Sequence, residues 1–240
     1  MSKKKFFKLS VIIPCFNEKK TIEKILNKIL LSLKTNNLQD YEIIIVDDCS
    51  KDGSREILKS KLENNNNIQV YFHNRNKGKG AAIKTAKKYI TGDIVIIQDA
   101  DLEYDPYDYA KLILPIINNE YKVVYGSRVL NKKRYNVKGF SSKFRIFANH
   151  ILTIISNFLN DQKLTDAHTC YKIFDKKIFD QIELEEDDFC FCPEVTSKIS
   201  KLGLKIFEVP INYNGRKYSE GKKISTIDGF KALKALIKYS

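Results

Sequence analysis

Two carboxylates, Asp99 and Asp101, stand two positions apart directly after the apolar run 93–98. An apolar, β-branched run of this length is typical of a buried strand, and the acids mark its exposed end. Carboxylates at this spacing can both reach one hard divalent cation, Mg²⁺ or Mn²⁺, and Glu103 offers a third oxygen ligand. A solvated turn explains an isolated Asp-x-Asp equally well, so the prediction of a metal site depends on the residues around it.

A second apolar run, 41–46, also ends on acids, Asp47 and Asp48. A carboxylate at such a strand end can accept hydrogen bonds from a nucleobase ring N–H or from ribose hydroxyls. The alternative is that one of the two acids caps the following helix, although Ser50 or Asp52 would serve as well. These residues predict a nucleotide-binding edge.

A glycine-bearing basic loop, 76–80, precedes a predicted helix and contains Lys77 and Lys79. Backbone amides and ammonium groups at a helix start can contact phosphate. The loop lacks the spacing of a Walker A motif, and a solvated basic helix start explains it almost as well.

Alternating strand and helix patterns over the first 130 residues predict the frame for these side chains. We expect strands at 9–14, 41–46, 68–72, 93–98 and 121–125, with helices at 18–33, 54–62 and 79–90 between them. Near-continuous apolar strands separated by helices predict an α/β fold with a mostly parallel central sheet covered on both faces. Ligands of such sheets bind at the carboxyl ends of the strands, where all the acids above are expected.

Length and composition exclude several classes of protein. The chain has 240 residues, of which 43% are hydrophobic, so it can bury a core. No apolar run approaches the roughly 20 residues of a membrane-spanning helix, and the short basic N-terminus lacks the features of a signal peptide. We therefore expect a cytoplasmic protein with reduced cysteines. A zinc site at His168, Cys170, Cys190 and Cys192 fits none of the usual ligand spacings.

The formal net charge of +13 has two readings. It reflects either a lysine-rich composition without functional meaning or a preference for an anionic partner. A basic nucleic-acid-binding module is the distant alternative, but the chain contains no recognised binding motif, and acids at the strand ends would repel a polyanion. We expect no nucleic-acid partner.

The pattern changes after residue 130. Ten large apolar residues are distributed over 140–159, as in one amphipathic helix or two helices joined by a bend. A helix start at Pro193 and Glu194 and a strand at 205–210 follow. From Arg216 onward, seven Lys and Arg residues stand against two acids, a local excess of 7 − 2 = +5.

Five ordered motifs together resemble glycosyltransferase family 2, and within it the dolichyl-phosphate or polyprenyl-phosphate mannosyl- and glucosyltransferase branch. The resemblance extends over residues 8–223 and is carried by the segments 11–18, 45–54, 76–80, 93–103 and 126–128. A nucleotidyltransferase that makes nucleotide-sugars would instead need a glycine-rich basic loop after the first strand. The resemblance implies a GT-A fold, Rossmann-like in its sheet, with a C-terminal acceptor-side subregion. It also implies a nucleotide-sugar donor of the GDP-mannose or UDP-glucose type, a divalent cation, and inversion at the anomeric carbon.

The resemblance also implies roles for individual residues. Asp47 or Asp48 would contact the base and ribose, and Arg128 the sugar-diphosphate or the acceptor phosphate. Glu103 stands where many relatives have Gln. The nucleotide pocket would be lined by Pro14, Phe16 and Glu18, and the diphosphate and metal element would comprise Gln98, Asp99 and Asp101.

A single domain, 1–240, follows from the lack of a clear linker. We expect a nucleotide-sugar-binding half at 1–130, an acceptor-side half at 131–225 and a C-terminal helix at 226–240. The segments 164–166 and 170–172 match the acceptor-side loop of the family, and 208–216 with 221–225 match its closing basic loop. Many relatives continue into transmembrane helices, whereas this sequence ends without them.

The chemistry of the acceptor decides which catalytic residues are needed. A lipid phosphate is already ionised near neutral pH and needs no strong base, but cations must offset its repulsion from the donor. Those cations would be Arg128, Arg216, Lys222 and Lys223. A saccharide hydroxyl, the alternative acceptor in cell-surface polysaccharide synthesis, needs a carboxylate base, for which Asp166 and Glu194 are the candidates.

The segment 140–159 and the basic tail together predict a protein that acts at a membrane surface without crossing it. A polyprenyl phosphate presents its head group at the same interface, on the inner face of the membrane. The alternative is that the apolar residues pack on the sheet, on a partner subunit or on a small membrane protein.

Overall fold

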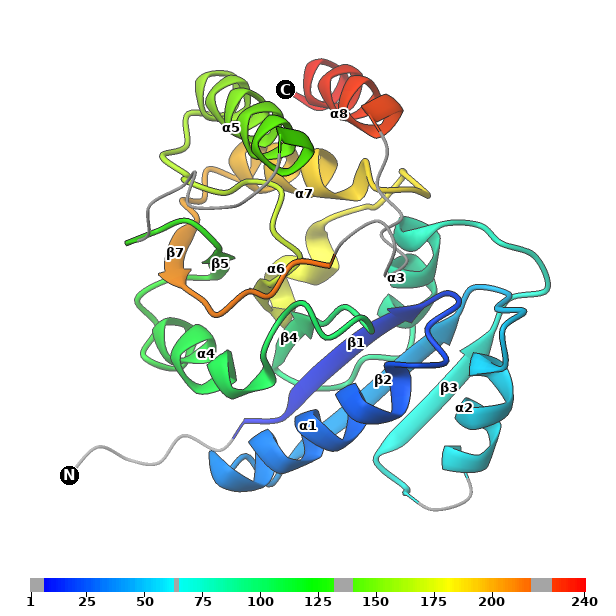
Figure 1. Cartoon of the computed structure of the whole chain (residues 1–240). Helices are drawn as coiled ribbons and strands as arrows, with labels where there is room; N and C mark the ends of the chain where they lie inside the picture. Colours follow the sequence, from blue (N-terminus) through cyan, green and yellow to red (C-terminus); the bar gives the residue numbers. More distant parts are fainter. Residues whose placement is uncertain (1–6, 63–64, 132–139, 217–225) are drawn as a thin grey trace.

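The computed structural model describes residues 7–62, 65–131, 140–216 and 226–240, and within these residues strands and helices alternate (Figure 1). The strands are β1 (Leu9–Cys15), β2 (Tyr41–Asp47), β3 (Ile68–Phe72), β4 (Ile94–Ile97), β5 (Val123–Ser127), β6 (Lys172–Asp175) and β7 (Phe207–Pro210). The helices are α1 (Ile22–Thr35), α2 (Ser54–Leu62), α3 (Lys79–Lys87), α4 (Tyr109–Ile117), α5 (Phe140–Asn160), α6 (Lys176–Gln181), α7 (Phe191–Lys201) and α8 (Thr226–Tyr239), with a short 3-10 helix η1 (Pro106–Asp108) before α4.

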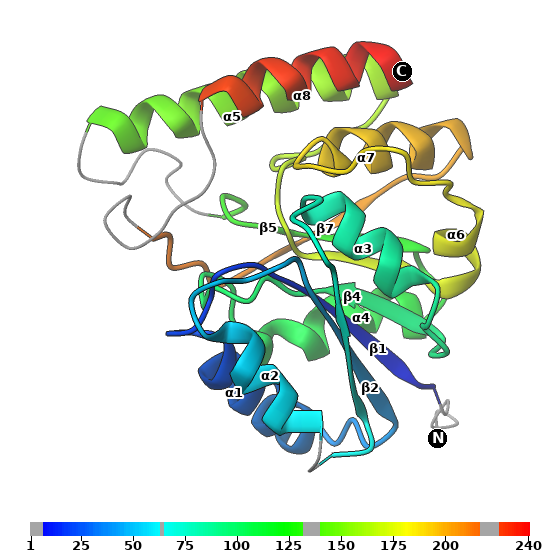
Figure 2. The same ribbon diagram turned by 90° about the vertical axis from the view of Figure 1, so that its right-hand side faces the viewer.

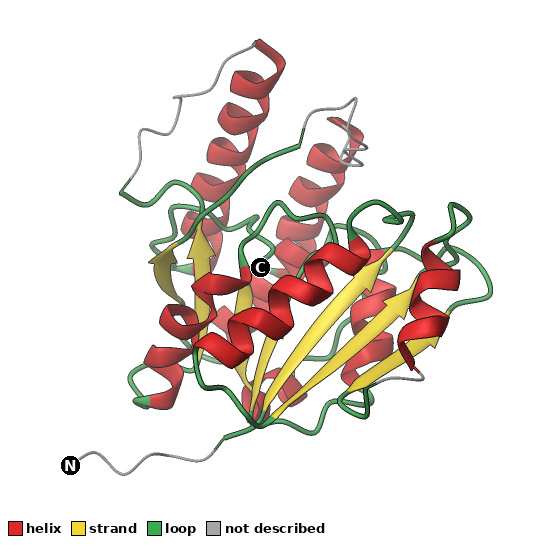
Figure 3. Cartoon of the chain, turned by 60° about the horizontal axis from the view of Figure 1, so that its bottom comes forward, coloured by secondary structure: helices red, strands yellow, loops and turns green. Residues whose placement is uncertain are grey.

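One sheet of seven strands, in the order β3-β2-β1-β4-β6-β5-β7, confirms the mostly parallel arrangement. β1 pairs in parallel with β2 and β4, with Ile13 opposite Ile45, and the strands fan out from one end of the sheet (Figure 3). β6 is antiparallel to both of its neighbours, β4 and β5. Because β6 runs in the opposite direction, the loop that leads into it lies at the same edge as the carboxyl ends of β4 and β5.

Helices cover both faces, because the strands are apolar on both sides. α1 buries Ile22, Ile25, Ile29 and Leu33, which recur at helical spacing, and turns its lysines to solvent. α1 and α2 lie on one face of the sheet and α3 on the other (Figures 1 and 2). The core between these layers consists mainly of fully buried Ile, Leu and Val side chains.

A second group of helices lies beyond the sheet. α5 and α8 run side by side over α7, on the side away from α1 and α2 (Figure 2). The segment 140–160 is thus one continuous helix rather than two. No helix among the described residues is both long enough and apolar enough to cross a membrane.

The element boundaries differ from expectation in a few places. β5 begins and ends two residues later than predicted, so Gly126 and Ser127 belong to the strand and Arg128 follows it. The first helix begins at Ile22 rather than at residue 18, which leaves Glu18 in the loop after β1. α4 was not predicted, although Tyr109, Leu112, Ile113 and Ile116 have helical spacing and are buried, because Pro115 interrupts its sequence pattern.

Candidate functional site

The acid that follows β4 is paired with a buried lysine. Lys79 begins α3 and places its Nζ 2.5 Å from Oδ1 of Asp99 and 3.4 Å from the sulfur of Cys170. Burial by itself would raise the pKa of Asp99, but the charge and hydrogen bond of Lys79 outweigh it and lower that pKa. Lys79 therefore neutralises the first acid of the Asp99 and Asp101 pair, and its contact with phosphate stays a prediction.

Three other carboxylates share one guanidinium. Nη2 of Arg216 lies 2.8 Å from Oδ2 of Asp101, and its two Nη atoms lie 3.1 and 3.2 Å from the oxygens of Glu18. Glu103 accepts hydrogen bonds from the backbone N–H of Arg216 at 2.8 Å and from the hydroxyl of Tyr213 at 2.5 Å. We call Glu18, Asp101 and Glu103 the acidic cluster. Arg216 contacts all three of these carboxylates.

The pKa of Asp101 reflects its burial and the charges around it. Burial, together with the nearby charges of Asp99 and Glu103, raises it to about 7, although Arg216 acts in the opposite direction. Hard oxygen donors whose charges repel one another are the set that a divalent cation stabilises. The oxygens of Asp99, Asp101 and Glu103 do not all lie within 4.8 Å of one another, because Lys79, Arg216 and Tyr213 hold them apart.

The two acids at the end of β2 have different surroundings. Asp47 is fully buried; its Oδ2 accepts hydrogen bonds from Nε of Arg55 at 2.9 Å and from the N–H of Ser50 at 3.2 Å. Its Oδ1 is buried without a hydrogen-bond partner among the described residues. A buried acceptor without a donor is costly, so this oxygen suits a donor group on a ligand, such as a nucleobase N–H or a ribose hydroxyl.

Asp48 instead holds the loop 76–80. Its carboxylate accepts hydrogen bonds from the N–H groups of Lys77 and Gly78, at 2.9 and 2.7 Å, and Nδ1 of His73 lies 2.7 Å away. Gly78 has a φ of +103°, and a Cβ there would lie 2.3 Å from the carbonyl oxygen of Asp187. Only glycine fits this position. The amides of Lys77 and Gly78 therefore face Asp48, whereas the sequence suggested that they face phosphate.

Two residues expected to line the nucleotide pocket, Pro14 and Phe16, lie at the end of β1, and Gln98 of the expected diphosphate and metal element directly follows β4. Pro14 is in β1 and Phe16 directly follows it, and both are half-buried. Gln98 is completely buried: its Oε1 accepts hydrogen bonds from the hydroxyls of Tyr109 and Tyr171, and its Nε2 donates to the carbonyl of Asp99. Through these contacts, Gln98 holds the backbone of Asp99 in place.

Across the edge from the acidic cluster, Arg128 is bound to a single carboxylate. Its Nε and Nη2 each lie 2.7 Å from an oxygen of Asp166, and its guanidinium lies over the ring of Tyr213. Burial would raise the pKa of Asp166, but the Arg128 charge and hydrogen bonds lower it below its usual value. A carboxylate held in this way is a poor proton acceptor.

Two residues that the sequence did not single out hold the loop that carries Asp166. Glu208 accepts hydrogen bonds from the backbone N–H groups of Thr165 and Asp166, at 2.7 and 2.9 Å. Lys172 is fully buried, and its Nζ donates to the carbonyls of Ala167 and Thr169. The contact from Glu208 spans more than 40 residues of sequence, so no local pattern could have indicated it.

Glu194, the second candidate base, is completely buried in the first turn of α7. Its carboxylate accepts hydrogen bonds from the N–H groups of Glu185 and Glu186, at 2.6 and 3.0 Å, and pairs with Lys198 at 2.9 Å. These contacts favour a structural role, because the carboxylate of Glu194 binds backbone N–H groups of the loop before α7. Lys222 and Lys223, the remaining candidates, lie outside the described residues.

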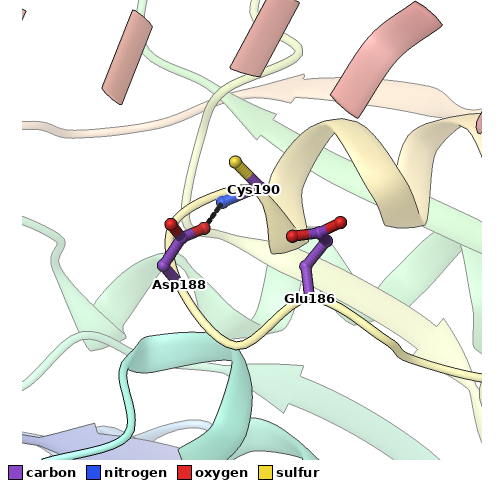
Figure 4. Close-up of side chains that lie close together, drawn as sticks. All are labelled: Glu186, Asp188 and Cys190. Atoms are coloured by element: carbon purple, nitrogen blue, oxygen red, sulfur yellow. Dashed lines mark hydrogen bonds between the residues drawn. The ribbon is translucent and has the colours of Figure 1, made fainter. Parts of the chain in front are cut away.

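Within the described part of the chain, the side chains that best match a set of metal ligands are Glu186, Asp188 and Cys190, whose ligand atoms lie within 4.8 Å of one another (Figure 4). Burial and the two acids raise the pKa of the Cys190 thiol to about 12. The carboxylates already pair with α8, Asp188 with Lys231 and Glu186 with Lys238, each at 3.1 Å. This cluster therefore anchors α8.

Comparison with known proteins agrees with this geometry. Residues 10–183 match the family model described as "Glycosyl transferase family 2". The UDP-N-acetylglucosamine–dolichyl-phosphate N-acetylglucosaminyltransferase of Methanococcus voltae is 34% identical over 245 residues, covering 95% of this chain and 94% of that protein. A dolichyl-phosphate beta-glucosyltransferase of Trichomonas vaginalis is 29% identical over 86% of this chain, which spans 65% of that protein's length.

Among solved structures, glucosyl-3-phosphoglycerate synthase from Mycobacterium tuberculosis, in complex with Mn²⁺, UDP and glucosyl-3-phosphoglycerate, superposes with a TM-score of 0.70. The sequence identity is 16%, and the superposition covers 97% of this chain and 80% of that one, which confirms the GT-A fold. The family model matches most of this chain, and the acids at the strand ends gather at one edge of the sheet. The chain therefore belongs to glycosyl transferase family 2.

Proposed function

We propose that this glycosyltransferase moves a hexose from a nucleotide-sugar to a polyprenyl phosphate, with inversion at the anomeric carbon. The observation that carries the proposal is the pairing of Asp166 with Arg128. A hydroxyl acceptor would need a free carboxylate base, but Asp166 is engaged by two charge-assisted hydrogen bonds and Glu194 binds backbone N–H groups of its own loop. A phosphate acceptor needs no base, and the relatives from M. voltae and T. vaginalis are both named for dolichyl phosphate.

The residues of the chain would then act mainly on phosphate charge. Arg128, held in one orientation by Asp166 and the ring of Tyr213, is suited to bind an acceptor phosphate. Arg216 lies among the carboxylates after β1 and β4 and is suited to bind the donor diphosphate. Holding two anions within attacking distance is costly unless such cations lie between them. The buried Oδ1 of Asp47 would accept a hydrogen bond from the base or the ribose.

Asp99, Asp101 and Glu103 would hold a divalent cation, Mg²⁺ or Mn²⁺. Their oxygen donors and the raised pKa of Asp101 fit such an ion, and the mycobacterial structure of the same fold contains Mn²⁺ with UDP. A bound divalent cation neutralises the charge that develops on the departing nucleoside diphosphate.

The apolar faces of α5 and α8 support a location at the membrane surface. Phe158 of α5 and Phe230 of α8 are 87% and 77% exposed. Other exposed apolar side chains on these two adjacent helices are Phe147, Ile151, Ile154 and Ile237. Two of the α8 lysines, Lys231 and Lys238, pair with the loop before α7, so the contact would be mainly hydrophobic rather than electrostatic.

Sedimentation with neutral and anionic phospholipid vesicles tests the membrane contact. We expect wild-type protein to bind with only weak dependence on salt, and the double variant Phe158→Ser/Phe230→Ser to stay in the supernatant. Leu114→Ser on α4 is the matched control, because Leu114 is 52% exposed on a helix away from this face. Absence of wild-type binding to either vesicle at low salt would contradict the proposal.

A transfer assay tests the reaction itself. UDP-glucose, GDP-mannose and UDP-GlcNAc are each offered with a polyprenyl phosphate in detergent or with a saccharide acceptor, in Mn²⁺, Mg²⁺ or EDTA. We expect a metal-dependent glycolipid product from one donor. Transfer to the saccharide hydroxyl without any lipid product would instead favour the cell-surface polysaccharide alternative.

A further inference from the structure

Arg216 occupies an unusual position for a cation that is to bind a ligand. Its guanidinium contacts Glu18, which follows β1, and Asp101, which follows β4. Its own backbone N–H holds Glu103. The side chain is only 16% exposed, so these ion pairs are largely shielded from solvent. One arginine is therefore the counter-ion of carboxylates from two separate loops.

The hydrogen bonds of this guanidinium are incomplete. Nε is buried and makes no hydrogen bond among the described residues, and Oε1 of Glu103 lies 3.6 Å from it. The five N–H donors of an arginine form a fork that matches the oxygens of a phosphate. The present arrangement thus pairs Arg216 with the acidic cluster but leaves its Nε–H without an acceptor among the described residues, and a phosphate oxygen would provide one.

A divalent cation at Asp101 would approach the same carboxylate oxygens that Arg216 holds. Two positive groups on one carboxylate repel each other, and the repulsion is strong where solvent is excluded. A nucleoside diphosphate changes this balance, because it adds negative charge and offers Arg216 new acceptors. With the diphosphate present, both cations can be accommodated.

We propose that Arg216 is an internal counter-ion that competes with the divalent cation for the acidic cluster in the free protein and turns to the diphosphate when the donor binds. This inference rests on the proposed function for the cation and the donor. It makes metal and nucleotide binding cooperative. By linkage, the diphosphate must strengthen metal binding by the same factor by which the metal strengthens diphosphate binding.

Binding of Mn²⁺, measured by electron paramagnetic resonance of the free ion, tests the inference without any enzymatic turnover. The full chain is titrated with Mn²⁺ alone and then with UDP or GDP present. For wild type we expect weak binding that the diphosphate strengthens. Arg216→Gln removes the competing charge, so it should bind Mn²⁺ alone roughly fivefold more tightly or better, and the enhancement by diphosphate should shrink by a similar factor.

Two further variants separate competition from a general change in charge. Arg128→Gln removes a cation that is paired with Asp166, and it should leave the binding of Mn²⁺ alone unchanged. Arg216→Lys keeps the positive charge and should stay near wild type. If Arg216→Lys gains as much Mn²⁺ affinity as Arg216→Gln, charge is not the cause and the inference is overturned. Circular dichroism verifies that each variant is folded.

The outcomes also distinguish this inference from the proposed function. Unchanged or weaker binding of Mn²⁺ alone by Arg216→Gln overturns the inference, whatever acceptor the transfer assay identifies. Failure of wild type to bind Mn²⁺ even with UDP or GDP overturns both the inference and the proposed metal site. A tighter Arg216→Gln supports the inference even where no transfer to polyprenyl phosphate is observed.

Discussion

Arg128 lies over the ring of Tyr213, Arg216 shares the acceptor Glu103 with the Tyr213 hydroxyl, and the charges of the two arginines are balanced differently. Arg128 has one carboxylate, Asp166, which it binds through two short hydrogen bonds. Arg216 is shared among the acidic cluster, and its Nε makes no hydrogen bond among the described residues. The ring of Tyr213 lies beneath Arg128, while its hydroxyl donates to Glu103 of the cluster.

The difference indicates which kind of ligand each region can bind. A matched buried pair holds a guanidinium in one orientation and needs nothing further for its stability. A group of carboxylates held close together is stabilised by an added positive ion. We therefore expect the Arg128 side to act through geometry and the Arg216 side to act through charge. The predictions below test this contrast.

The largest effect is expected at Asp101. Asp101→Asn removes the charge of the cluster at its centre, and activity should fall on the order of a hundredfold or more because stabilisation of the leaving diphosphate is lost. Steady-state transfer rates measure this, with Asp161→Asn as control, since the side chain of Asp161 is 96% exposed and pairs with Lys205 on the surface. Full activity of Asp101→Asn, or of wild type in EDTA, would be inconsistent with a metal at this site.

The second largest effect is expected at Asp166, and it tests whether this carboxylate acts by orienting Arg128. Asp166→Asn keeps the volume of the side chain but frees Arg128, so KM for the acceptor should rise by roughly ten- to a hundredfold, the value of one or two charge-assisted hydrogen bonds. Affinity for the nucleotide should not change. A loss confined to kcat, with KM for the acceptor unaltered, would instead indicate that Asp166 is a catalytic base.

A smaller effect is expected at the end of β2. Asp47→Asn should weaken nucleotide binding by about tenfold, because a hydrogen bond to a charged acceptor is worth about 1.5 kcal/mol or more. Asp48→Asn should weaken it indirectly, by releasing the loop that Lys77 and Gly78 form. Calorimetric titration with UDP and GDP measures both variants. If both bind nucleotide as wild type does, this edge does not recognise the base or the ribose.

The smallest effect on catalysis is expected at Glu194. Glu194→Gln replaces a carboxylate that accepts two backbone hydrogen bonds with an amide that can accept them through only one oxygen. The free energy of unfolding should fall by about 1–3 kcal/mol, while kcat/KM of the folded protein stays within about twofold. Thermal unfolding and transfer assays measure the two quantities. A hundredfold loss of kcat in a stable variant would favour a hydroxyl acceptor with Glu194 as the base.

The sequence alone determined the alternation of strands and helices up to β4, the strand β5, the parallel core of the sheet, and the acids at the ends of β2 and β4. These features are local: the β-branched runs of β1, β2 and β4 and the helical spacing of α1 depend on residues a few positions apart. The motifs at the strand ends were sufficient to recognise the resemblance to the family, and the direction of the parallel strands brings them to one edge.

Only the tertiary structure decided how the charges pair. Arg216 meets Glu18 across 198 positions, and Arg128 meets Asp166 across 38. The antiparallel insertion of β6 brings the Asp166 loop to the edge where β4 ends. The α8 lysines, counted as excess charge in the sequence, pair with acids before α7. Electrostatic interaction depends on distance and burial, and neither is present in the order of residues along the chain.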